Sequence, residues 1–92
     1  MTIEEFAQRV QEGEQSSLRR VKLDCQVNMD NAITRIKPGR KWTKVDVGHS
    51  GRYMIDPEGR IFGIKAYGVP HLGHCFGTLE APSETCFRGR WG

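Results

Sequence analysis

The sequence predicts an α+β domain in which an N-terminal helix packs on a small antiparallel β-sheet, a meander of about four to five strands. Three observations support this class. The first residues repeat apolar side chains at helical spacing, residues 42–67 alternate apolar and polar side chains between turn sequences, and most of the 11 glycines fall after residue 38. A chain of 92 residues suits one hydrophobic core, so we expect a single domain over residues 1–92.

The first predicted element is a helix over residues 3–12. Thr2 and Glu5 have the spacing of a capping box, in which each side chain bonds the other residue's backbone amide. The apolar residues that share one face of this helix are Ile3, Phe6, Ala7 and Val10. Gly13 is expected to end the helix.

Two short strands are expected next. Residues 21–27 alternate apolar and polar side chains, which predicts a half-buried strand. Asp30-Asn31 predicts a turn. A second strand is expected over residues 32–37, and Pro38-Gly39 is expected to end it.

A three-stranded meander is predicted over residues 42–67. Its elements are a strand over 42–47, a four-residue loop over 48–51, a strand over 52–56, a turn over 56–59 and a strand over 60–67. The sequence Asp56-Pro57-Glu58-Gly59 has proline and glycine at the positions that a tight turn favours. In the last strand we expect Phe62, Ile64 and Ala66 to share a face.

The C-terminal part carries a weaker pattern. Val69-Pro70 is incompatible with a central strand, and residues 75–79 are expected to form a last short strand. Residues 80–92 are expected to form an irregular tail, in which Phe87 and Trp91 favour partial docking or a partner contact. We expect the domain to fold without the chain after Leu79.

The formal net charge of +3 is unevenly distributed. The first 15 residues carry four acids against Arg9, whereas residues 16–92 carry 13 bases against seven acids. Residues 35–44 hold five bases and no acid, with Trp42 among them; the bases are Arg35, Lys37, Arg40, Lys41 and Lys44. Such a segment can contact phosphates and stack on a base. The alternative is a solvated hairpin with Trp42 packed beneath the lysine stems. Arg19 and Arg20 form a second basic candidate.

No constellation for catalysis or metal binding stands out. His71, His74, Cys75 and Cys86 do not have the spacing of a zinc site, so no metal or cofactor is expected. The other candidate catalytic side chains, His49, Asp46 and Lys65, follow no motif. With Cys25, the three cysteines are expected to be free thiols. No apolar run reaches the length of a membrane span, and the acidic N-terminus is unlike a secretory signal, so we expect a cytoplasmic protein.

Three sequence blocks lie within residues 41–80: KVDVG-x-SG-x-YM, IFGIKAYGV and H-x-GH-x-FGTL. With these blocks and its length, the chain resembles the type I-F anti-CRISPR proteins, small proteins encoded by phages and mobile elements. The resemblance implies a non-enzymatic inhibitor that binds the Cas backbone subunits of the CRISPR RNA-guided surveillance complex and blocks pairing of the guide with target DNA. Contact with the guide RNA is left open.

On this resemblance, the basic segment would meet guide-RNA phosphate, and the acidic helix would face lysines of the complex through Glu4, Glu5 and Glu12. The pI of about 9.0 departs from inhibitors that are acidic mimics of DNA. The protein would act in the cytoplasm of the infected bacterial host and be a monomer when free. The alternatives are a free nucleic-acid-binding phage regulator and, less favoured, a small ribonuclease.

Overall fold

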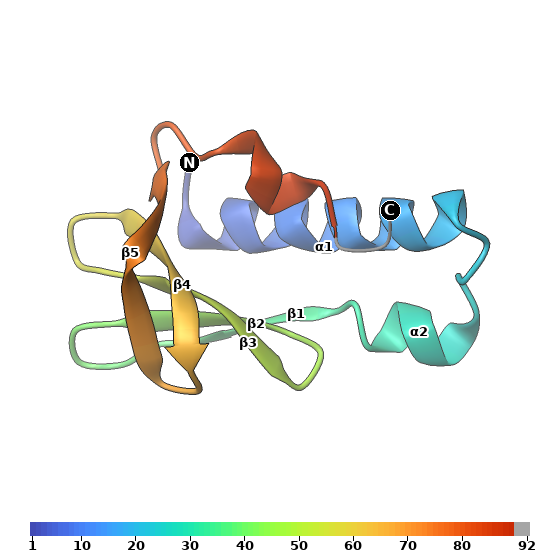
Figure 1. The fold of residues 1–92 in the computed structure, drawn as a ribbon, viewed down its shortest axis with the longest axis horizontal. Helices are drawn as coiled ribbons and strands as arrows, with labels where there is room; N and C mark the ends of the chain where they lie inside the picture. The colour runs from blue at the N-terminus through green and yellow to red at the C-terminus, as the bar shows by residue number, and fades with distance from the viewer. Residues whose placement is uncertain (90–92) are drawn as a thin grey trace.

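The computed structural model describes residues 1–89, which form two layers. Helix α1 (Ile3–Arg20) lies across one face of a five-stranded antiparallel sheet (Figure 1). The strands, in chain order and in sheet order, are β1 (Thr34–Lys37), β2 (Thr43–Val47), β3 (Ser50–Ile55), β4 (Arg60–Ala66) and β5 (Val69–Thr78). The predicted α+β class, with its helix on a meander sheet, is confirmed.

Helix α1 begins as predicted but ends later. The capping box is present, with the Glu5 amide donating to Thr2 Oγ1 at 3.1 Å and the Thr2 amide donating to Glu5 Oε1 at 3.1 Å. The helix then passes through Gly13 and continues to Arg20, so the predicted end at residue 12 is wrong. Gly13 is needed for a close approach instead, because a Cβ there would collide with the backbone carbonyl of Phe87.

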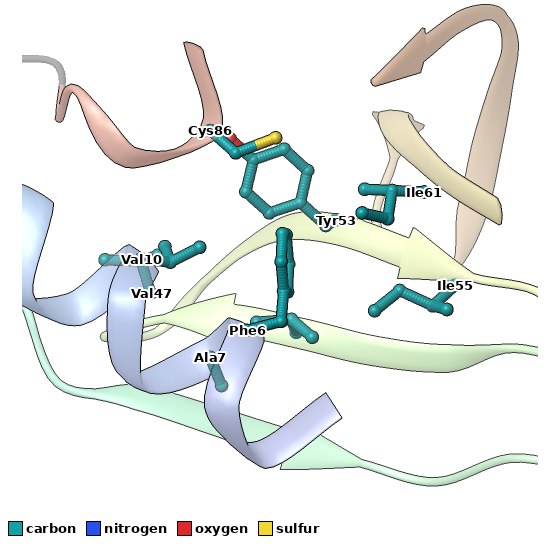
Figure 2. Packing of buried hydrophobic residues seen from close by; sticks show 9 residues of the cluster. Phe6, Ala7, Val10, Val47, Tyr53, Ile55, Ile61 and Cys86 are labelled. Atoms are coloured by element: carbon teal, nitrogen blue, oxygen red, sulfur yellow. The ribbon is translucent and has the colours of Figure 1, made fainter. Parts of the chain in front are cut away.

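The hydrophobic core lies between α1 and the sheet (Figure 2). Its buried members are Phe6, Ala7, Val10, Val45, Val47, Tyr53, Ile55, Ile61 and Cys86. Phe6 meets the ring of Tyr53 edge-on at 5.5 Å and that of Phe87 at 5.6 Å. Strand β4 contributes Ile61, whose cross-strand partner is Ile55, whereas Phe62 projects from the opposite face of the sheet.

The strand predicted over residues 21–27 is wrong. The chain turns after α1, with Lys22 at φ 61°, and then forms α2 (Gln26–Asp30), so Asp30-Asn31 is the end of a helix. Local hydrogen bonds favour this helix, because Gln26 Nε2 donates to Asp30 Oδ1 at 2.7 Å. Val27, expected to face inward, is 68% exposed. Within residues 1–89, no strand lies beside residues 21–27 to pair with them, so the alternation there did not produce a strand.

The meander over β2–β4 agrees with the prediction apart from its first turn. Val47 pairs with Ser50, so the turn is Gly48-His49 rather than residues 48–51, and Gly48 supplies the positive φ of 63° that it needs. The predicted turn over residues 56–59 is confirmed. Asp56 Oδ1 accepts hydrogen bonds from the amides of Glu58 at 3.1 Å and Arg60 at 2.8 Å.

The C-terminal part is more ordered than predicted. Strand β5 starts at Val69 rather than residue 75, and it tolerates Pro70 because β5 lies at the edge of the sheet. The 3₁₀-helix η1 (Glu84–Phe87) then packs along α1 (Figure 1), with Cys86 only 3% exposed in the core. Phe87 therefore docks, and the irregular tail predicted over residues 80–92 contains an ordered helix. Trp91 lies outside the described residues.

Candidate nucleic-acid-binding face

The sheet has one face under α1 and one face directed away from it, which we call the open face. A row of cross-strand partners runs across four strands on this face: Lys37, Lys44, Met54 and Phe62. Directly opposed residues on neighbouring strands project to the same side. Because Val45, the neighbour of Lys44 in β2, points into the core, this row must point away from α1.

Aromatic side chains lie on the open face beside bases. Trp42, just before β2, meets the ring of Phe62 edge-on at 5.5 Å. Lys41 Nζ lies 5.8 Å from the centre of the Trp42 ring, and the Arg60 guanidinium lies 6.0 Å from that of Phe62. Trp42 is half-buried, so it is packed on the sheet and also accessible to a ligand.

Tyr67 anchors a polar cluster on the same face. Its hydroxyl donates to Asp46 Oδ2 at 3.1 Å and accepts from Lys37 Nζ at 3.1 Å. Lys37 Nζ also lies 3.2 Å from Asp46 Oδ2, and Lys44 Nζ lies 4.9 Å from the centre of the Tyr67 ring. The hydrogen bond to Tyr67, and then that to Asp46, raise the pKa of Lys37. The cluster therefore keeps two cations beside a half-exposed aromatic ring.

The backbone explains why Tyr67 can lie over the sheet. It occupies the turn between β4 and β5 together with Gly68, which has a φ of 80°. A Cβ on Gly51 would lie 3.0 Å from Tyr67 Cδ1, so glycine leaves the space that the ring fills. Asp46 lies beneath, with 2% of its side chain exposed. A buried carboxylate is tolerated because it is paired.

The structure gathers most of the predicted binding residues. Arg35 in β1 lies directly opposite Asp46 in β2 in the strand register, so it projects on the open face together with Lys37 and Lys44. Arg40, Lys41 and Trp42 lie in or next to the β1–β2 connection, at the border of the same face. Arg19 and Arg20 do not join them, because they lie in the last turn of α1, at the end of the molecule occupied by α2 (Figure 1).

The acidic residues predicted to contact a protein lie in the other layer. Glu4, Glu5 and Glu12 are exposed on α1, away from the open face. The residues of the open face that sequence reasoning missed are Tyr67, which is exposed, and Phe62 and Asp46, which are buried. A signal for Tyr67 was its place before Gly68 at the end of an alternating segment. The sequence held no sign that Tyr67 would meet Asp46.

Other chemistry-bearing side chains do not assemble into a site. The rings of His71 and His74 stack at 4.2 Å in a bulged part of β5. Within residues 1–89, no group of three or more histidine, cysteine or acidic side chains could hold a metal ion. Cys25, Cys75 and Cys86 are free thiols. No helix in the described part of the chain is long and apolar enough to cross a membrane.

No protein-family model, curated protein or solved structure matches this chain. The resemblance to type I-F anti-CRISPR proteins stays a prediction.

Proposed function

We propose that this protein is a non-enzymatic binding module that contacts single-stranded nucleic acid through its open face. One observation carries the proposal: five bases and two accessible aromatic rings lie on or beside one face, and the Asp46 carboxylate between them is buried and paired. Phosphates attract the bases, and bases of the nucleic acid can stack on the aromatic rings.

Single strands fit this face better than a duplex. Trp42 and Tyr67 present ring surface, and only an unpaired strand has bases free to stack on them. Each stacked base contributes roughly 1–3 kcal/mol. Lys37, Lys44 and Arg35 lie on neighbouring strands around these rings, where they can contact the phosphates that link successive bases.

A second proposal sets this contact within a protein complex. The sequence blocks that resemble type I-F anti-CRISPR proteins span β2 to β5, and these strands supply much of the open face. In that setting the nucleic acid would be the guide RNA of a surveillance complex in the cytoplasm of an infected bacterium. Acidic α1 residues on the opposite layer would face cationic Cas subunits, so the protein would block hybridisation of target DNA.

The first proposal is tested by fluorescence anisotropy with a labelled nine-nucleotide uridine strand. Arg35, Arg40 and Lys41 are changed together to glutamate; Lys37 is kept, because a glutamate there would face buried Asp46. The control reverses Arg19, Arg20 and Lys22, which gives the same change in net charge at the α2 end of the molecule. We expect the first variant to lose affinity and to show a shallower salt dependence, and the control to change much less.

Equal losses in both folded variants would show that binding follows net charge and not the open face. Cleavage of the labelled strand would instead favour the ribonuclease alternative. The second proposal is tested with purified type I-F surveillance complex and a labelled target duplex. We expect the wild-type protein to bind the complex and prevent hybridisation, whereas free binding to RNA without any effect on the complex would favour a nucleic-acid-binding regulator.

A further inference from the structure

Asp46 is a buried carboxylate on the open face, and only one of its two oxygens has hydrogen-bond and ion-pair partners. Oδ2 accepts from the Tyr67 hydroxyl at 3.1 Å and lies 3.2 Å from Lys37 Nζ. Oδ1 is buried and has no hydrogen-bond partner within residues 1–89. An unsatisfied buried acceptor is costly, so an oxygen retained in this state points to a donor that arrives with a ligand.

The cover over this carboxylate is Tyr67. Its side chain lies in the β4–β5 turn and is 53% exposed, although its hydroxyl reaches down to Asp46. Tyr67 is not part of the hydrophobic core between α1 and the sheet. Outward rotation of this side chain would therefore break polar contacts to Lys37 and Asp46 and leave the core packing in place.

We propose that Asp46 recognises the Watson–Crick edge of a guanine in the single strand, with Tyr67 rotating outward to admit the base. This inference rests on the proposed function. Guanine presents two adjacent N–H donors on this edge, at N1 and N2, and a carboxylate presents two acceptors and no donor. The guanine would supply a donor to Oδ1 and replace the hydroxyl that Oδ2 loses.

Other bases satisfy the carboxylate less well. Adenine and cytosine have one amino group beside a ring nitrogen that is an acceptor, and uracil has one N–H between two carbonyl oxygens. Each of these edges sets an acceptor against a carboxylate oxygen. Lys37 and Lys44 remain beside the site, where their charges offset that of Asp46 and can meet the flanking phosphates.

The test compares three nine-nucleotide strands by fluorescence anisotropy: all uridine, uridine with one central guanosine, and uridine with one central inosine, which lacks the N2 amine. For the wild-type protein we expect the guanosine strand to bind about tenfold tighter than the uridine strand, and inosine to lose most of this gain. Asp46→Asn should abolish the guanosine preference, measured as the ratio of guanosine-strand to uridine-strand affinity within that variant. Tyr67→Phe, which keeps the ring but loses the hydroxyl contact, should retain the preference.

The outcomes separate this inference from the proposed function. If the uridine strand binds but guanosine and inosine bind equally, the guanine-recognition inference is overturned and the open face stands as a binding surface. A folded Asp46→Asn protein that retains the guanosine preference also overturns it. If no strand binds, both proposals fail. The wild-type comparison of guanosine with inosine decides the matter even if Asp46→Asn does not fold.

Discussion

Gly13 lies inside α1 at the point where the backbone of Phe87 crosses the helix. Replacing a helical glycine with alanine normally stabilises a helix by about 1 kcal/mol. Here the added Cβ would collide with the Phe87 carbonyl, so η1 would have to move. We expect Gly13→Ala to lower the thermal unfolding midpoint by roughly 5–10 °C, because overpacking costs typically 1–3 kcal/mol.

The matched control is Ser16→Ala, an exposed position of the same helix that should leave the midpoint unchanged or slightly higher. Circular dichroism during heating measures both variants. A Gly13→Ala protein that is more stable than the wild type would show that η1 does not lie against this part of α1.

Asp56 makes stability depend on acid. Burial raises the pKa of Asp56, but hydrogen bonds from Arg60 and from the Glu58 amide outweigh this and hold the pKa below its usual value. A carboxyl with a lowered folded-state pKa contributes stability above its unfolded pKa of about 3.9, and this contribution is lost as the pH falls through the folded-state pKa. When the pH is lowered from about 5 to about 2, the thermal unfolding midpoint should therefore fall less in Asp56→Asn than in the wild type.

The control for this acid dependence is Asp24→Asn. Asp24 is exposed in the segment between α1 and α2, so its removal should leave the pH profile of the wild type in place. If Asp56→Asn keeps the full wild-type pH dependence, the acid sensitivity arises at other carboxyl groups.

At the scale of elements, the sequence did not reveal that η1 contributes to the hydrophobic core. It brings Cys86 into the core and sets the Phe87 ring between Phe6, at 5.6 Å, and the guanidinium of Arg9, at 4.0 Å. We therefore reverse the expectation that the domain folds without the chain after Leu79. Truncation there should abolish cooperative thermal unfolding, because it removes a buried core member and exposes Phe6.

A milder pair of variants tests the same element in the full chain. Phe87→Ala should destabilise the protein by about 2 kcal/mol, since the ring is only partly buried. Arg88→Ala, an exposed neighbour, should change stability by less than about 0.5 kcal/mol. A truncated protein that unfolds cooperatively at the wild-type temperature would contradict this role for η1.

The elements that the sequence predicted correctly are those defined by local signals. The capping box, the alternation in β2–β4 and the turn at Asp56 each depend on neighbouring residues. Residues 21–27 show the limit of that approach, because alternation cannot reveal whether a partner strand exists. The length of α1 could not be predicted from the sequence either. Gly13 is compatible with a helix end, and only the position of the Phe87 backbone shows why a glycine is needed there.

At the scale of the molecule, the open face is basic, whereas the exposed side chains of α1 include both acids and bases. Exposed acids on α1 lie on one side of the sheet, and the bases of residues 35–44 lie on or beside the other side. A basic face of this kind attracts polyanions. The basic run was visible in the sequence because it is continuous. The contact between Tyr67 and Asp46 was not, because it is a side-chain hydrogen bond between residues 21 positions apart, one in β2 and one in the turn after β4.

The open face is the surface that we propose binds single-stranded nucleic acid. The most direct test is an amide and indole N–H chemical-shift titration of the isotope-labelled protein with a nine-nucleotide uridine strand. We expect the largest shifts at the Trp42 indole, at Lys37 and Lys44, and in the turn at Tyr67, with little change along α1. Shifts concentrated on α1 or η1, or no saturable shifts at all, would contradict the assignment of the open face as the binding surface.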